Sequence, residues 1–251
     1  MEERQKLALY AYMYDGDWTR IATAQRAGIT PVMHDIRENY ITCLDEDYPR
    51  QLRALRYPPW VVFYRGDLSL LKRRMLSIVG SRDMQPYGEA CTRMCAGLLK
   101  EKFVLVSGLA KGTDGLVHRC AMAGGHTVGV IGSGFSRAYP AENRDLYRRM
   151  EQDDLILSEY PYHTGVRKHH FPWRNRLIAA LGEALIVTQA ALKSGTMLTV
   201  NEAISLNRDV YAVPWPLMDP HGFGCNKLIS EGAMILYDPD QLRDIMRNNS
   251  C

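Results

Sequence analysis

From Met75 onward the chain alternates short apolar runs with stretches of helical character, and this alternation constrains the fold more than any other feature. The runs are nearly continuous in Val, Ile and Leu, as expected of strands that are buried on both faces. They span residues 75–79, 103–106, 127–131, 155–157, 184–188, 210–213 and 234–237, with helical candidates at 87–100, 114–123, 141–150, 175–181 and 198–207. Strands and helices that alternate in this way predict an α/β fold, a mostly parallel sheet with helices on both faces.

The first 58 residues differ from the rest and predict a small helical subdomain. Residues 2–14 and 17–27 have the character of short helices, with Gly28 as a helix cap. Pro58 and Pro59 mark the boundary, and the apolar residues 60–64 predict a strand. We therefore expect a helical subdomain at residues 1–58 and a sheet domain at residues 59–251.

Composition and cysteine usage exclude several classes of protein. No run approaches the roughly 18 apolar residues that cross a bilayer, and the charged stretch from Met1 to Lys6 does not resemble a secretory signal. Six cysteines in 251 residues are too few for a disulfide scaffold, and they contain no CxxC pair that would indicate a zinc site. These features predict a reduced, cytoplasmic protein. The formal net charge of +3 does not by itself indicate a nucleic-acid partner.

Glycine, serine and charged residues gather where the predicted strands end. Ligands of an open parallel sheet bind beyond the carboxyl ends of its strands, and glycine followed by a helix N-terminus suits an anion such as phosphate. The set favours phosphate binding, although a tight strand-to-helix turn explains each glycine alone equally well. The turns contain Gly80-Ser81-Arg82, Ser107-Gly108 with Lys111, Gly132 with Gly134, Ser158-Glu159 and Ser194-Gly195-Thr196.

The most informative segment is residues 163–176, HTGVRKHHFPWRNR, which carries four Lys/Arg, three His and no acid. Cations neutralise phosphates, and an aromatic ring such as Phe171 offers a face on which a base can stack. The segment therefore predicts a site for single-stranded nucleic acid. A solvated basic loop, with Phe171 and Trp173 in the core, explains the same composition.

Candidates for catalysis and metal binding are weaker. Asp114 and His118 lie one helical turn apart, and they are either an acid–base pair or residues that hold the fold together. His169 and His170 are adjacent and point in different directions, so no metal site is expected. No nucleophile, base and orienting group occur together. We expect a binding protein without a cofactor.

Taken together, these residues resemble the DprA/Smf family of DNA-processing proteins over about residues 59–237. The resemblance lies in an ordered string of motifs, which is far more specific than any one of them. The string comprises Gly80-Ser81-Arg82 with Tyr87-Gly88; Ser107-Gly108-Leu109-Ala110 with Gly112, Asp114 and His118; Gly132 and Gly134 with Tyr139-Pro140 and Asn143; Ser158-Glu159 with Pro161; Phe171-Pro172 with Arg174-Asn175-Arg176; Ser194-Gly195-Thr196 with Thr199; and Gly224 with Asn226 and Gly232.

The resemblance implies an extended Rossmann fold that binds single-stranded DNA and loads the recombinase RecA onto it during natural transformation. It also implies a homodimer formed through the Rossmann domain and a helical, SAM-like N-terminal domain. By position, Arg82 and Lys168 would contact phosphate and Phe171 a base. The C-terminal winged-helix-like domain of many relatives is not expected here. Trp215 after Pro214 departs from the family's usual glycine.

We therefore expect a DNA-binding surface that combines the strand ends with the basic segment. The alternative is a nucleotide-processing enzyme of the phosphoribohydrolase type, with Glu159 or Glu202 as its catalytic carboxylate. A role through protein contacts alone is a third hypothesis, and residues 217–237 suit a dimer surface or the core equally well. The expected DNA-binding residues are Gly80, Ser81, Arg82, Ser107, Gly108, Lys111, Gly132, Gly134, Lys168, Phe171, Arg174, Asn175, Arg176, Ser194, Gly195 and Thr196.

Overall fold

A nine-stranded sheet forms the centre of the molecule, and the computed structural model describes residues 1–247. Across the sheet the strands follow the order β1-β2-β6-β5-β4-β3-β7-β8-β9. Neighbours from β6 to β9 in this order pair in parallel, whereas β2 runs antiparallel to both β1 and β6. The strands are β1 (Asn39–Thr42), β2 (Val61–Gly66), β3 (Met75–Val79), β4 (Val104–Ser107), β5 (Thr127–Ile131), β6 (Leu155–Ser158), β7 (Ala184–Val187), β8 (Asp209–Ala212) and β9 (Met234–Ile235).

The predicted mostly parallel sheet is confirmed. The expected apolar runs lie on β2 to β9, and the bounds differ by two residues at most. Every residue of β3, β4, β5, β6 and β7 is buried, which is why these runs lack the polar alternation of a half-exposed strand. Because the carboxyl ends of parallel strands meet at one edge, the turns that follow β3, β4 and β5 lie close together.

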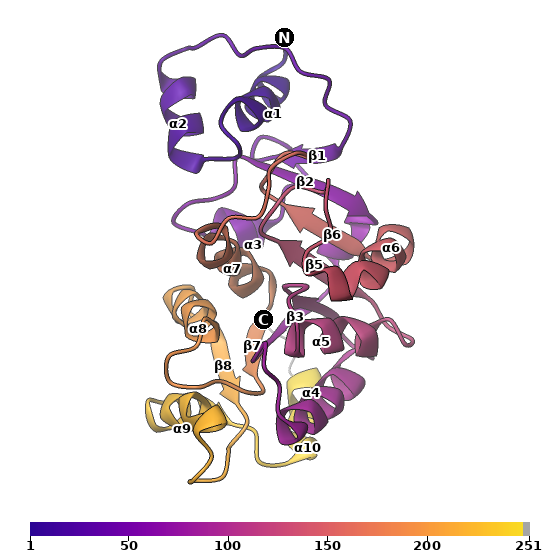
Figure 1. Ribbon diagram of the computed structural model, residues 1–251, viewed down its shortest axis with the longest axis vertical. Coiled ribbons are helices and arrows are strands. Elements are labelled where there is room, and N and C mark those ends of the chain that lie inside the picture. The colour runs from indigo at the N-terminus through magenta and orange to yellow at the C-terminus, as the bar shows by residue number, and fades with distance from the viewer. Residues whose placement is uncertain (248–251) are drawn as a thin grey trace.

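Helices cover both faces of the sheet, as expected. α4, α5 and α10 pack together on one face, and α7 and α8 pack together on the other (Figure 1). α7 begins five residues earlier than the sequence predicts, because a proline such as Pro172 is tolerated in the first turn of a helix. The helices are α4 (Pro86–Leu99), α5 (Thr113–Ala121), α6 (Arg144–Asp153), α7 (His170–Leu181), α8 (Thr196–Ser205), α9 (Phe223–Ser230) and α10 (Pro239–Arg247).

The N-terminal segment is only partly helical, which corrects the expectation for residues 1–58. α1 (Glu3–Met13) and α2 (Trp18–Arg26) confirm the two predicted helices, and Figure 1 shows them together at one end of the molecule. Residues 39–42, however, form β1, and a short helix follows at α3 (Arg50–Arg53). β1 becomes a strand because pairing with β2 buries Ile41 and Thr42 at the sheet edge. A domain boundary at residue 58 stays a prediction.

The unusual Trp215 fills a specific place near the C-terminal part of the sheet. Its indole is buried and donates a hydrogen bond from Nε1 to the carbonyl oxygen of Thr188, 3.0 Å away. The ring of Tyr87 meets it edge-on at 5.0 Å. Gly222 lies against the indole so closely that a side chain there would overlap it. The loop after β8 is therefore shaped by the packing of this one side chain.

Two further observations concern the whole described chain. Over residues 1–247, no helix is long and apolar enough to cross a membrane. The five cysteines within this range are free thiols, and Cys251, the sixth, lies outside the described residues.

Candidate nucleic-acid interface

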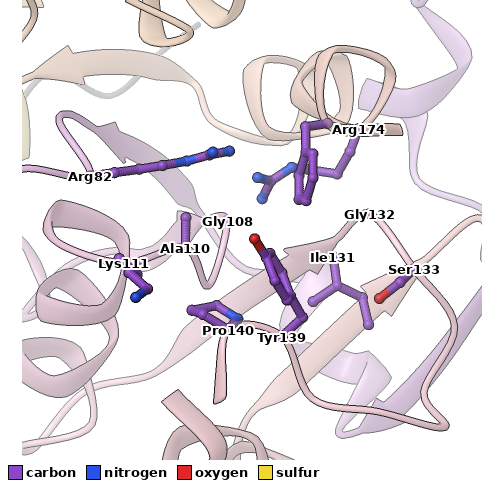
Figure 2. Close-up of a pocket in the computed structure, with 11 residues that line it drawn as sticks. Arg82, Gly108, Ala110, Lys111, Ile131, Gly132, Ser133, Tyr139, Pro140 and Arg174 are labelled. Carbon is purple, nitrogen blue, oxygen red and sulfur yellow. The ribbon is translucent and has the colours of Figure 1, made fainter. Parts of the chain in front are cut away.

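A cavity of about 180 Å³ opens where β3, β4 and β5 end. Each of the three turns contributes to its wall, and the first turn of α7 covers it from the other side of the sheet. Figure 2 shows the guanidinium groups of Arg82 and Arg174 pointing toward one another across this space, with the hydroxyl of Tyr139 directed into it. The lining residues are Arg82, Gly108, Ala110, Lys111, Ile131, Gly132, Ser133, Tyr139, Pro140, Phe171 and Arg174.

Arg82 and Phe171 meet at this cavity. The guanidinium carbon of Arg82 lies 5.1 Å from the centre of the Phe171 ring, a cation–π contact that joins the β3 turn to α7. The centre of the Tyr139 ring lies 5.8 Å from that of the Phe171 ring. A cation and two aromatic rings therefore stand side by side, which is the combination that binds a phosphate and a neighbouring base.

The loop after β4 is held in place by three buried polar side chains. The backbone N–H of Ala110 donates to the carboxylate of Asp114 at 3.3 Å, and that of Leu109 donates to Nε2 of His118 at the same distance. Asn143 donates its amide to the carbonyl oxygens of Leu109 and Ala110. Asp114 and His118 thus hold the loop separately, so the structure supports their structural interpretation over the acid–base pair.

The His118 ring is a neutral imidazole. Thr127 donates its hydroxyl proton to the carbonyl oxygen of Leu105, so Nδ1 of His118, 2.7 Å from that hydroxyl, must carry the proton it shares. Nε2 is left as the acceptor for Leu109. Burial, with repulsion from Arg174 second, lowers the pKa of His118 to about 3.

Arg174 is a buried cation that lies close to two oxygen groups, a carbonyl and a carboxylate. Its Nη1 donates to the carbonyl oxygen of Val130 at 2.6 Å, and the Asp114 carboxylate lies nearby. Burial lowers the pKa of Arg174 and raises that of Asp114, and the attraction between the two charges opposes both shifts. Gly108 passes between them, where any side chain would overlap both groups. A glycine is therefore required here by close approach.

The structure brings six of the sixteen expected residues to this cavity: Arg82, Gly108, Lys111, Gly132, Phe171 and Arg174. Lys111 forms an exposed ion pair with Glu142. Lys168 lies outside the cavity on the exposed loop before α7. Neither Arg82 nor Lys168 is ion-paired within the described part of the chain.

Arg176 occupies a different place from the one its basic segment suggests. It is 3% exposed and forms a bidentate ion pair with Glu159, and it also donates to the carbonyl oxygen of Tyr57. A buried, doubly engaged guanidinium is not available to a phosphate. The contacts of Arg176 in this structure are structural and occupy Glu159 as well, so its burial argues against the expected DNA contact, which stays a prediction.

Several other expected residues support the turns without entering the cavity. Ser107 donates its hydroxyl to the carbonyl oxygen of Ile78 and joins β3 to β4. Thr196 donates to the carbonyl oxygen of Gly80, and its N–H donates to the hydroxyl of Ser194. The remaining residues outside the cavity wall are Ser81, Gly134, Asn175 and Gly195.

Five lining residues were not foreseen as part of the site: Ala110, Ile131, Ser133, Tyr139 and Pro140. Tyr139 is the most important of them, because the residue is 46% exposed and its ring lies beside that of Phe171. The Tyr139-Pro140 motif was a usable signal, but 32 positions separate Tyr139 from Phe171 in the sequence. Among residues 1–247, no group of three His, Cys, Asp or Glu side chains is arranged to hold a metal ion.

Comparison with known proteins identifies relatives over most of the chain. The family model described as DNA recombination-mediator protein A matches residues 39–247. The chain is 40% identical over 207 residues to the DNA processing protein DprA of Bacillus subtilis, covering 81% of this chain and 70% of that protein. It matches the X-ray structure of DNA processing protein A from Streptococcus pneumoniae with a TM-score of 0.82 and 31% identity, covering 98% and 93% of the two chains. A structure that describes the single-stranded DNA binding mode of the Helicobacter pylori protein matches with a TM-score of 0.77 and 28% identity, covering 85% and 99%.

The state of His118 predicts how stability depends on pH. The unfolded chain takes up a proton at this histidine below pH about 6.5, whereas the folded chain resists it down to about pH 3. The free energy of unfolding therefore falls as the pH falls, by about 1 kcal/mol from pH 6.5 to pH 5.5 for this group. Denaturant titration at the two pH values measures the loss.

Two histidine variants distinguish the contribution of His118 to this pH dependence from the contributions of the other titrating groups. In His118→Gln the acid-induced loss becomes smaller, although the variant is less stable at neutral pH. His163→Gln, which alters an exposed imidazole, keeps the wild-type loss. Burial lowers the pKa of His170, which adds to the loss of stability in acid, and raises the pKa of Asp114, which opposes that loss. Both residues are present in every variant, so their contributions cancel in the comparison. An equal loss in wild type and His118→Gln contradicts the prediction.

Proposed function

Since the chain belongs to the DNA recombination-mediator protein A family, we propose that it binds single-stranded DNA at the cavity beyond β3, β4 and β5 and acts as a recombination mediator. The observation that carries this proposal is the cation–π pair of Arg82 and Phe171 at the cavity. It presents a charge for a phosphate and a ring for a base within one nucleotide's reach.

The charges around the cavity suit a strand that runs along its rim. Arg82 and Lys168 are exposed, and no carboxylate among the described residues pairs with them. They would neutralise successive phosphates, while Phe171 and Tyr139 would receive the base. The Helicobacter pylori relative, whose structure concerns a single-stranded DNA binding mode, supports the same substrate.

Single strands fit this site better than duplex does. A base must leave its stack before it can lie on an aromatic ring, and in a duplex that step costs free energy. The cavity is also small, about 180 Å³, and its walls are fixed by buried hydrogen bonds. We therefore expect a preference for strands whose bases are already exposed.

We also propose that the chain binds DNA without catalysing a reaction on it. A nucleotide-processing enzyme would need a catalytic carboxylate, and of the two candidates Glu159 is held by Arg176. Glu202 lies on α8, outside the cavity wall. Asp114 is buried and accepts the hydrogen bond that fixes the loop after β4. These engagements favour binding, and release of a free base from nucleoside monophosphates would contradict it.

The binding site predicts the effects of three substitutions. Arg82→Ala and Lys168→Ala each weaken single-strand binding and flatten the dependence of log affinity on log salt by about one unit, because one phosphate contact is lost. Phe171→Ala weakens binding by about 1–3 kcal/mol with little change in the salt dependence, because stacking is uncharged. Equilibrium titration with an oligo-dT at two salt concentrations measures both quantities.

As matched controls, one arginine and one lysine are replaced at the opposite edge of the sheet, so each control also removes one positive charge. Arg73 precedes β3 and Lys102 precedes β4, and both are exposed. Arg73→Ala and Lys102→Ala therefore lower the net charge equally but leave the affinity near that of wild type. Equal affinity of the wild-type chain for duplex and single strands contradicts the proposal.

We further propose that the mediator step is loading of RecA onto the bound strand in the cytoplasm during natural transformation. The family description, recombination mediation, supports this step. Its test is RecA's DNA-dependent ATPase activity on DNA covered by a single-strand-binding protein. We expect the wild-type chain to increase the ATPase activity of RecA. We expect the Arg82→Ala variant to increase it far less. No increase with the wild-type chain contradicts RecA loading.

We also propose a homodimer that forms through the end of the sheet at β9. Both residues of this edge strand are exposed. Leu217 and Met218 in the loop after the neighbouring strand β8 are 84% and 87% exposed, and Tyr237, which follows β9, is 70% exposed. Apolar side chains at an open sheet edge favour association with another chain. Figure 1 shows that this region, with α9, lies at the opposite end of the molecule from α1 and α2.

The proposed dimer predicts a change of mass with substitution. The double variant Leu217→Asp, Met218→Asp sediments as a monomer under conditions in which wild type is a dimer, because two charges enter an apolar contact. Leu44→Asp, which alters a 54% exposed leucine in the N-terminal part, leaves the dimer intact. A dimer that survives the double variant contradicts this surface.

A further inference from the structure

The loop before α7 carries two neighbouring cations, Arg167 and Lys168, whose surroundings differ. Lys168 has no ion-pair partner among the described residues, whereas Arg167 donates from Nη2 to the Asp15 carboxylate at 2.7 Å. We propose that Arg167 is a further phosphate-binding residue and that Asp15 masks it until a strand displaces the carboxylate. This inference rests on the proposed function of the same site.

Asp15 approaches the loop from a distant part of the sequence. It lies in the turn between α1 and α2, and 152 positions separate it from Arg167. The hydroxyl of Thr164 also reaches its carboxylate, at 3.4 Å. The carboxylate therefore contacts the basic loop at two points, and it joins the N-terminal helices to the segment that carries Lys168.

The α1–α2 turn is fixed in this position by its backbone. Asp15 and Gly16 both have positive φ angles, +52° and +74°, and a side chain on Gly16 would lie 2.6 Å from the carbonyl oxygen of Glu159. The N–H of Gly16 donates to Ala11 at the end of α1. The turn thus packs against Glu159 and Tyr160, which directly follow β6, and the carboxylate of Asp15 stays within reach of Arg167.

The neighbouring acid on this turn has a different role. Asp17 accepts the N–H of Arg20 and caps α2, so its carboxylate is engaged at the start of α2. Asp15 has no such local partner in the structure as described, and its contacts are those with Thr164 and Arg167. It is therefore the carboxylate of this turn that acts on the loop.

The ion pair is weak enough to be exchanged. The side chains of Arg167 and Asp15 are 48% and 50% exposed, and exposed pairs of this kind contribute little to stability. A phosphate that binds beside Lys168 offers Arg167 another anionic partner, one that can accept two hydrogen bonds from its guanidinium. When the phosphate replaces Asp15, the carboxylate loses its ion-pair partner. This loss opposes DNA binding, so the affinity for DNA is lower than the positive charge of the loop alone would give.

Removal of the carboxylate tests this competition. Asn adopts positive φ as readily as Asp, so Asp15→Asn keeps the turn and removes the charge. We expect the affinity for an oligo-dT to rise about two- to fivefold at low salt, the range that exposed ion pairs support. We also expect the salt dependence to steepen by up to about one unit, because Arg167 then releases its own counterion on binding.

A double-mutant cycle shows whether the effect passes through Arg167. Arg167→Ala weakens binding, and adding Asp15→Asn to it brings no further gain, because no masked cation remains. Glu3→Gln serves as the matched control, because it removes an exposed carboxylate on α1 that pairs with Lys6 and not with the loop. It leaves the affinity near that of wild type.

The outcomes separate this inference from the function on which it rests. If wild type fails to bind single strands at low salt, the proposed function itself is wrong. If wild type binds but Asp15→Asn behaves like Glu3→Gln, Asp15 does not mask Arg167. If Asp15→Asn binds more weakly while circular dichroism and thermal unfolding match wild type, the carboxylate positions the loop, and the masking proposal is overturned.

Discussion

The buried guanidinium of Arg174 is the interaction on which the candidate site depends. A buried charge is strongly unfavourable unless it is paired and hydrogen-bonded. The groups that stabilise the Arg174 guanidinium are therefore held in place around it. Its Nη1 donates a hydrogen bond to the carbonyl oxygen of Val130 on β5, and the nearby carboxylate of Asp114 on α5 attracts its charge, while its Nε has no hydrogen-bond partner among the described residues. The hydrogen bond ties α7 to β5, and it brings Phe171, three positions earlier on α7, to the strand ends.

The same constraint extends outward through the loop after β4. Asp114, His118 and Asn143 together satisfy the backbone of Leu109 and Ala110, so the wall of the cavity is ordered before any ligand arrives. A site with prearranged walls loses less conformational freedom on binding than a flexible one does. The exposed cations, by contrast, are placed on the rim, where a long strand can reach them.

Sequence alone predicted much of this arrangement and missed some of it for identifiable reasons. The parallel sheet followed from apolar runs without polar alternation, and the cavity partly followed from the turns after β3, β4 and β5. The burial of Arg176 was not predicted, because composition cannot distinguish a cation that faces solvent from one that is buried against Glu159. β1 was missed because a strand of four residues at a sheet edge is defined by its partner. The Asp15–Arg167 contact joins residues that no local pattern connects.

The central claim is that single-stranded DNA binds at the turns after β3, β4 and β5 and along the loop before α7. Amide hydrogen exchange, followed by mass spectrometry with and without saturating oligo-dT, tests it most directly. The account predicts slower exchange in peptides that cover residues 80–83, 108–112, 132–134 and 163–171, and unchanged exchange in α9. Unchanged exchange at all four segments, with binding saturated, would contradict it.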